Sequence, residues 1–219
     1  TGEGLNIKLE SERTDVEIRY TLDGTEPTYE SVTYSDSLLI QESTVLKAAA
    51  FKNNVKMGQT LVLELKFNKA TGKLITGNNK DESLLTNGVR GSLRQSDFEW
   101  CTWGNHINTF VLDLKKKESI NKFTITCLTN YGMGVHKPKS IKLEISDNGK
   151  EYTLVEDRKF YDKEIFKEGN FKEDICFELK DTESQYIRVS LEAAGKIPSY
   201  HFMRPGQISK FYVDEICVE

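Results

Sequence analysis

Hydrophobic and polar residues alternate along the first part of this chain. Apolar side chains occupy every second position in residues 5–9, 16–22 and 61–67, with shorter apolar runs between them. A period of two is typical of a strand with one buried face. The first 68 residues therefore hold five or six short strands, and no helical pattern interrupts them. We predict a small β-sandwich over residues 1–68.

Alternation returns after residues 68–81, a polar segment that we interpret as the linker and whose residues 73–76 are apolar enough to begin a strand. The turn-forming residues 146–149, Ser-Asp-Asn-Gly, predict a hairpin. Three consecutive lysines at 115–117 indicate a solvated turn, and the charged residues 157–174 a long loop. Strands are predicted at residues 73–76, 109–114, 120–127, 141–145, 152–154, 175–179, 186–191 and 211–216. Around eight strands predict a jelly-roll sandwich over residues 69–219.

Two long connections interrupt this second β-region. Residues 84–108 contain both tryptophans, Trp100 and Trp103, and residues 195–210 contain Tyr200, His201 and Phe202. Long structured loops on a β scaffold commonly carry binding residues. We expect both loops to gather at the ends of the second sandwich.

Composition and charge exclude several classes of protein. The chain has 219 residues and a net charge of −4, with a pI near 5.6, so it lacks the basic surface that binds nucleic acid or anionic membranes. No run of about 18 apolar residues predicts a membrane span, and no signal peptide is visible. Because the chain starts at Thr1 in strand-like sequence, we expect a fragment of a longer protein.

The four cysteines show no metal or redox spacing. Cys127, Cys176 and Cys217 lie in apolar strand-like runs, and no C-x-x-C pair occurs. We favour free thiols, buried with the strands that carry them. One or two disulfides are the alternative.

Residues 18–31, IRYTLDGTEPTYES, followed by VTYSDSLLI and STVLKAAAFKNN, resemble a known accessory domain. It is the small fibronectin-III-like domain that follows the catalytic barrel of bacterial chitobiases and β-hexosaminidases. The resemblance is strongest over residues 16–52. There the Asp23-Gly24 turn ends a strand and Pro27 prevents further edge pairing.

The second region resembles the discoidin-like, or coagulation factor V/VIII type C, domain. The matching stretches are LLTNGVRGS, W-x-x-W-G, VLDLKKKESI, KPKSIKLEISDNGKEY, YIRVSLEAAG and VDEICVE, in that order, over residues 84–219. Within this family it is similar to family 32 carbohydrate-binding modules, whose fold is galactose-binding-like. The pairing of the two domains is similar to the C-terminal region of family 20 glycoside hydrolases.

This resemblance implies one structural calcium ion. Calcium takes about six to eight oxygen ligands, many of them main-chain carbonyls. The positions that match the family site are Leu85, Asn87, Arg90, Ser92 and Glu215. Asn87 stands where the family commonly has Asp, which removes one negative charge and should weaken the site. Without calcium, Asn87-Gly88 is a turn held by its own hydrogen bonds.

Sugar recognition needs an aromatic face and a few polar groups. One cluster contains Trp100, Trp103, Asn105 and His106. We favour Trp100 as a core residue beneath the loop over a sugar contact. Trp103 is open to either role. The second cluster, in residues 197–206, supplies the candidate ligand contacts Tyr200, His201, Phe202 and Arg204, and the alternative is that these residues stabilise the loop. Pro198 and Pro205 bracket this loop and favour a preformed site.

Nothing in the sequence indicates catalysis. Asp214 and Glu215 are neighbours on a predicted strand, so we expect them on opposite faces, where they could not flank one glycosidic bond. The histidines His106, His136 and His201 show no metal spacing, and residues 132–134 indicate a flexible hairpin tip.

We therefore expect an all-β, non-catalytic, carbohydrate-binding tail of a glycoside hydrolase resembling β-N-acetylhexosaminidases. Its partners would be a galactose or N-acetylhexosamine glycan and an upstream catalytic domain in cis. The parent enzyme would be secreted, periplasmic or on the bacterial cell surface. The alternative is a structural or oligomerisation module with no sugar site.

Overall fold

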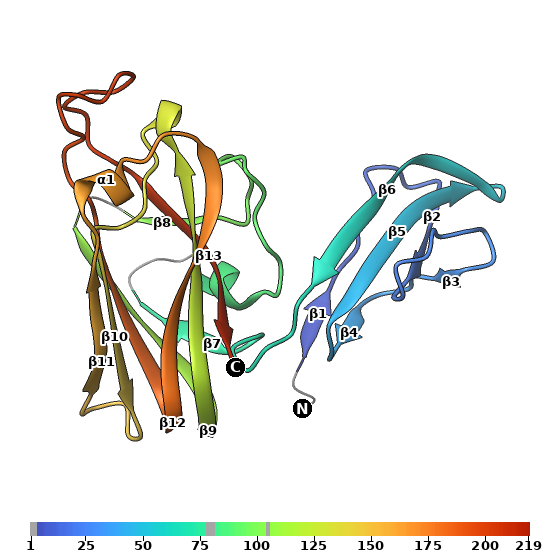
Figure 1. Ribbon diagram of the computed structural model, residues 1–219. Coiled ribbons are helices and arrows are strands. Elements are labelled where there is room, and N and C mark those ends of the chain that lie inside the picture. Colours follow the sequence, from blue (N-terminus) through green and yellow to red (C-terminus); the bar gives the residue numbers. More distant parts are fainter. Residues whose placement is uncertain (1–3, 78–81, 104–105) are drawn as a thin grey trace. The chain divides into compact units, whose positions relative to one another are not determined.

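The computed structural model describes residues 4–77, 82–103 and 106–219. The chain divides into two compact units, Thr1–Phe67 and Asn68–Glu219. Both are built almost wholly of strands, as the alternation predicts (Figure 1). The helices in the described ranges are short, and none of them is long and apolar enough to cross a membrane.

The first unit is a two-sheet sandwich. Its larger sheet has the order β3-β2-β5-β6 and its smaller sheet pairs β1 with β4. Buried side chains of β4 and β5, among them Ile40 and Leu46, form its core. The strands are β1 (Leu5–Ile7), β2 (Glu17–Thr21), β3 (Val32–Thr33), β4 (Leu38–Ile40), β5 (Thr44–Lys52) and β6 (Val55–Leu65).

Two turns of the first unit have the geometry that their residues favour. Asn53 and Asn54 join β5 to β6 with φ angles of 49° and 65°, and Lys52 pairs with Val55 across the turn. Positive φ at both central residues is typical of a two-residue hairpin whose twist matches its strands, and Asn tolerates it. At the Asp23-Gly24 turn, Gly24 has φ 77° and donates to the Val45 carbonyl.

The second unit is a larger sandwich. Its strands pair in the order β11-β10-β12-β9-β13-β8, and β7 also pairs with β9. The strands are β7 (Leu74–Thr76), β8 (Cys101–Trp103), β9 (Ile107–Asn130), β10 (Ser140–Ser146), β11 (Thr153–Lys159), β12 (Asn170–Glu192) and β13 (Phe211–Val218). The strand expected at residues 73–76 is thus present, and the all-β sandwich prediction is confirmed.

Two long strands pass through both layers of this sandwich. Residues 107–113 of β9 pair with 186–192 of β12, whereas 118–130 of β9 pair with 170–184 of β12. The prediction of four separate strands here was wrong in its boundaries. The lysines do not end a strand: Lys115 takes φ 72° within a bulge, and β9 continues beyond it.

The charged segment 157–174 is also more ordered than expected. β11 runs to Lys159, the short helix α1 (Asp162–Ile165) follows, and β12 begins at Asn170. The 3-10 helix η2 (Tyr131–Met133) forms the tip between β9 and β10, and Gly134 ends it with φ 70°. Figure 1 shows α1, η2 and the loop after β12 at one end of the sandwich, opposite the β10–β11 turn.

The core of the second unit lies between the two layers. Phe110, Phe123 and Phe177 are almost completely buried there, with Phe123 and Phe177 edge to face at 6.1 Å. The four cysteines are present as thiols, as the favoured prediction had it, but only Cys101 and Cys127 are buried, whereas Cys176 and Cys217 are partly exposed.

Candidate functional site

The loop between η1 (Glu82–Thr86) and β8 covers the outer face of β9 and β13. Trp100 anchors it, because the indole is 5% exposed and packs with Leu128 and Val135. Its Nε1 donates to the Ser92 carbonyl at 3.0 Å. Trp100 is therefore a core residue beneath the loop, which was the preferred reading of the sequence.

Asp214 and Glu215 both face this loop. Asp214 accepts a hydrogen bond from the Gly91 amide at 2.6 Å, and both oxygens of Glu215 accept from the Gly88 amide at 3.1–3.2 Å. A bulge in β13 makes this possible, since Asp214 pairs with Thr126 and the next paired residue is Ile216. The expectation that the two carboxylates point to opposite faces was wrong, because the extra residue breaks the alternation.

Burial makes this acidic pair difficult to ionise. Burial and then the neighbouring Asp214 raise the pKa of Glu215 to about 9. Burial also raises the pKa of Asp214 to about 6, against the hydrogen bonds from the amides of Gly91 and Glu215. In the described residues no Lys or Arg forms an ion pair with Glu215, and Arg90 instead contacts Asp174 at 2.6 Å.

The predicted calcium positions other than Glu215 lie in η1 and in the loop whose Gly88 and Gly91 amides bond these carboxylates. Asn87 Oδ1 accepts from the Val89 amide, and its Nδ2 donates to Glu99 at 2.7 Å. The Ser92 carbonyl is partly engaged by Trp100, and Leu85 is fully buried. No three His, Cys, Asp or Glu side chains in the described ranges are placed to hold a metal ion. A site here would depend on main-chain carbonyls of Leu85, Arg90 and Ser92, with Asn87 and Glu215. That all-oxygen donor set fits calcium.

The loop of residues 196–210 forms a second feature at the end of the sandwich that carries α1 and η2. Its base is closed by main-chain hydrogen bonds: Ile197 donates to Gln207, and Gly206 donates to Ile197. Its tip exposes large side chains, with Tyr200 66% and Phe202 86% exposed. We call residues 197–207 the aromatic loop.

The side chain of His201 points inward from the aromatic loop and is not on the surface. It is 1% exposed, and its ring stacks on Tyr131 at 3.7 Å between centroids. It also meets His136 nearly at right angles, at 5.3 Å. Arg204 is likewise directed inward, since Nε donates to the Gly132 carbonyl at 2.8 Å. These two candidate contacts hold the loop in place, whereas Tyr200 and Phe202 face solvent.

The remaining candidates, Trp103 and His106, contact the chain outside the aromatic loop. Trp103 pairs with Phe211, where the chain returns from the loop, and its ring stacks on Phe211 and Phe110 at 5.7 and 6.0 Å. His106 is exposed, and its carbonyl accepts from Ala193, where the chain enters the loop. Asn105 lies outside the described residues.

Sequence reasoning missed the support of the aromatic loop. Tyr131 and His136 hold the loop from η2 and the following turn, and Phe166 meets His136 edge to face at 5.0 Å. Residues 132–134 are thus a hairpin tip, as expected, but one that docks a distant loop. The sequence signal was Tyr131 followed by Gly132 and Gly134. This pattern alone does not show which segment Tyr131 contacts.

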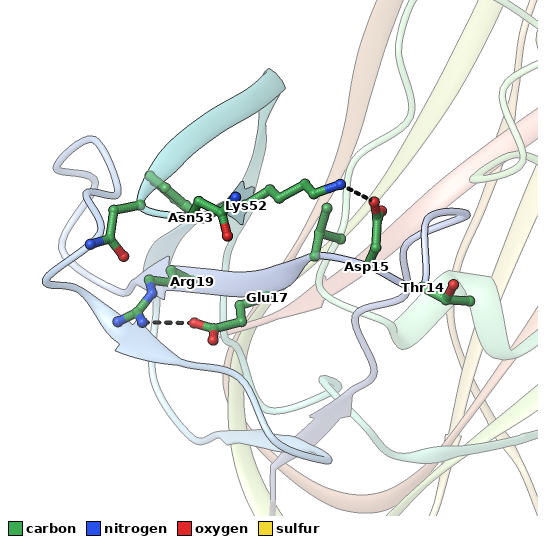
Figure 2. Close-up of a pocket in the computed structure, with 9 residues that line it drawn as sticks. Thr14, Asp15, Glu17, Arg19, Lys52 and Asn53 are labelled. Carbon is green, nitrogen blue, oxygen red and sulfur yellow. Dashed lines mark hydrogen bonds and ion pairs between the residues drawn. The ribbon is translucent and has the colours of Figure 1, made fainter.

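The first unit contains a separate hollow of about 420 Å³ beside the β5–β6 turn. Its lining charges neutralise one another: Lys52 pairs with Asp15 at 2.6 Å and Arg19 with Glu17 at 2.7 Å (Figure 2). Phe51, the aromatic residue of its lining, is 5% exposed. The hollow offers no open ring on which a sugar could stack.

Fold and site together define an all-β chain of two sandwiches, the second with an aromatic loop at one end. The F5/8 type C domain model matches residues 68–202, which are 135 of the 219 residues. The chain therefore belongs to the F5/8 type C domain family. The chitobiase/beta-hexosaminidase C-terminal domain model matches residues 2–62. Both resemblances noted in the sequence are confirmed.

Solved structures similar to this chain include three bacterial modules. CpGH89CBM32-6 of Clostridium perfringens has 16% identity and a TM-score of 0.46 over 70% of this chain and 98% of its own. The fucose binding module SpX-3 of Streptococcus pneumoniae has 15% identity and a TM-score of 0.46 over 70% and 97%. CpGH89CBM32-4 of C. perfringens, in complex with glcNAc-alpha-1,4-galactose, has 15% identity and a TM-score of 0.43 over 70% and 94%. No curated protein sequence matches the chain.

Proposed function

We propose that this chain is a non-catalytic, carbohydrate-binding tail of a glycoside hydrolase, and that its second unit binds glycan at the aromatic loop. The observation that carries the proposal is the exposure of Tyr200 and Phe202 on a loop whose base is hydrogen-bonded. Large aromatic side chains held in water by a braced loop are typical of a binding surface.

The loop is suited to bind a sugar ring without rearranging. Pro198 and Pro205 restrict its backbone, and Arg204 fastens it to Gly132. Preorganisation reduces the entropy lost on binding, which matters for a ligand that buries little area. A single sugar ring would bind weakly, with a dissociation constant in roughly the millimolar range.

Trp103 and His106 support the same location. They contact Phe211 and Ala193, four residues beyond either end of the aromatic loop, and exposed His106 could donate to or accept from a hydroxyl group. Stacking on Phe110 and Phe211 leaves Trp103 only partly exposed, so an edge contact is the role open to it.

For the ligand we propose a terminal galactose or N-acetylhexosamine residue. The match of the first unit to the chitobiase/beta-hexosaminidase C-terminal domain points to an upstream catalytic domain in cis, of the β-N-acetylhexosaminidase type. Such an enzyme would act outside the cytoplasm, secreted, periplasmic or on the bacterial surface. The tail would hold it close to its glycans.

We further propose a structural calcium ion beside Glu215. Support comes from two carboxylates, Asp214 and Glu215, whose pKa values are raised mainly by burial, an effect that the nearby Arg90 opposes without cancelling. A bound divalent cation would provide further positive charge and fix the loop that Trp100 anchors. It would take no part in sugar chemistry.

The test is titration of the labelled protein with galactose, N-acetylgalactosamine and N-acetylglucosamine, followed by NMR. We expect shifts in residues 197–207, and Tyr200→Ala or Phe202→Ala should weaken binding about tenfold or more. Tyr29→Ala is the matched control, since Tyr29 is a 49% exposed aromatic residue of the first unit. If no sugar shifts the loop signals, the proposal is wrong and a purely bracing or oligomerisation role becomes the better reading.

A further inference from the structure

Two histidines form a buried pair under the aromatic loop. His136 and His201 are 0% and 1% exposed, and their rings are perpendicular with centroids 5.3 Å apart. His136 belongs to the turn after η2, and His201 to the aromatic loop itself. The pair is therefore part of the contact that docks the loop on the sandwich.

The hydrogen bonding fixes the protonation state of His201. Its Nδ1 accepts a hydrogen bond of 3.0 Å from the Arg204 amide. An imidazolium carries a proton on both nitrogens and cannot accept, so the docked loop requires neutral His201 with its proton on Nε2. Protonation would make Nδ1 a donor that faces the Arg204 N–H, and the hydrogen bond would break.

The surroundings of the pair give a positive charge little support. Within the described residues, Nε2 of His201 and both ring nitrogens of His136 have no hydrogen-bond partner. Tyr131 and Phe166 meet the rings as aromatic faces and edges. Lys137, the next residue along the chain, is directed to Glu173 at 3.0 Å and over Phe160 at 4.4 Å.

The groups around the pair leave both histidine pKa values below the ordinary value. Burial and then the neighbouring His201 lower the pKa of His136 to about 4, and the Ile165 backbone opposes this effect. Burial also lowers the pKa of His201. Its own backbone and Glu168 oppose this effect, and Arg204 adds to it.

We propose that His136 and His201 form a proton-sensitive latch, which keeps the aromatic loop docked while both are neutral and releases it on acidification. The link to glycan affinity rests on the function proposed above, but the latch itself does not. A docked pKa below the ordinary value means that docking is fully stable above about pH 6.5 and weakens as pH falls. With values of about 4 docked and about 6.5 released, His136 alone should raise the released population about 30-fold between pH 8 and pH 5.

The test is an NMR titration of the intact chain from pH 8 to pH 4. It follows the ring signals of His136 and His201 and the amides of residues 197–207. We expect both rings to remain neutral well below the ordinary histidine pKa of about 6.5, and the loop signals to change as they titrate. If both rings titrate at or above about pH 6.5, the latch is wrong.

Two variants remove the titrating groups, and each keeps one of the contacts that the histidine makes. His136→Phe preserves an aromatic ring among aromatic neighbours, and His201→Asn retains an acceptor for the Arg204 amide. Each should reduce the acid response of the loop, relative to its own signals at pH 8. Asp147→Asn is the control, because Asp147 is an exposed acid of the distant β10–β11 turn and should leave the response intact. An undiminished response in both histidine variants overturns the proposal.

Sugar titrations at pH 8 and pH 5 complete the experiment. The latch predicts that affinity falls at pH 5 in the wild type, and less in His136→Phe. If sugar affinity falls equally in the wild type and in His136→Phe, the acid sensitivity does not depend on His136, which contradicts the latch. If no sugar binds at any pH, the proposed function fails, whereas the ring and loop titrations still decide whether the latch exists.

Discussion

The indole of Trp100 fills the space in which a side chain at Gly91 would lie. A Cβ atom at residue 91 would stand 2.6 Å from Cε2 of the ring and 2.7 Å from Nε1. Contacts this short require the loop or the tryptophan to move. Gly91 thus sets how closely the loop of residues 87–100 can approach the sheet.

Gly91→Ala should lower the free energy of unfolding of the second unit by about 1–3 kcal/mol, the usual cost of overpacking. Tryptophan fluorescence during urea unfolding measures it, since both tryptophans lie in this unit. Gly132→Ala is the control: a Cβ there has nothing within 4 Å, so the change should remain within about 0.5 kcal/mol. Equal effects of the two variants would contradict the close packing.

The raised pKa of Glu215, about 9, predicts an unusual pH dependence. The folded chain retains a proton that the unfolded chain releases near pH 4.5, so this contribution to stability is complete below pH 4.5 and is lost as pH rises through 9. With a chelator present to remove calcium, the free energy of unfolding should decrease as pH rises, by at most about 1.4 kcal/mol per pH unit for one proton. Urea unfolding at pH 6, 7.5 and 9 measures the slope.

Glu215→Gln should flatten that slope, because the amide oxygen can still accept from Gly88 but does not titrate. Glu219→Gln is the matched control, since Glu219 is half-exposed and pairs with Lys122. A slope that persists in Glu215→Gln would assign the proton to another group, such as Asp214.

Calcium should reverse this behaviour, because the cation favours the ionised carboxylate. Adding calcium should raise the melting temperature of the second unit, by an amount equivalent to about 2.7 kcal/mol at 100 times the dissociation constant. Asn87→Asp should tighten binding, since it adds a negative charge and keeps the oxygen that accepts from Val89. An unchanged melting temperature with calcium and with chelator would rule out the site.

Arg204→Lys tests how the aromatic loop is fastened. Lysine retains the charge but cannot reproduce the Nε bond to Gly132 together with the packing of Cδ over Gly134. Residues 197–207 should become more mobile in 15N relaxation, and sugar affinity should fall about three- to tenfold. Arg94→Lys, an exposed change in the other loop, should do neither. Unchanged loop mobility in Arg204→Lys would show that other contacts dominate.

Alternation of apolar residues predicted most of the β-structure, because one buried face per strand leaves a clear period of two. The runs at 141–145 and 186–191 became paired strands with buried Ile141, Leu143 and Val189. The same reasoning failed at bulges. Lysine and glutamate also occur in regular strands, so the residue types at Lys115 and Glu215 do not reveal a bulge. Only the pairing with the neighbouring strand shows it.

The candidate site was less predictable, for a tertiary reason. Tyr200, His201 and Phe202 are consecutive and equally aromatic, yet two face solvent and the middle one is buried against Tyr131. Tyr131 is about 70 positions earlier in the chain, so no local pattern could indicate which of the three turns inward. Burial of Trp100 was predictable because its loop had a sheet to cover.

The shared strands β9 and β12 also affect how this unit can fold. Their ladder runs from Asn130 paired with Asn170 to Ile107 paired with Glu192. Closing the first pair spans 40 residues and the last spans 85, a difference that costs roughly 0.6 kcal/mol more in chain entropy. Pairing is thus favoured to begin beside η2, so the end of the sandwich that docks the aromatic loop is expected to form before the end that carries the β10–β11 turn.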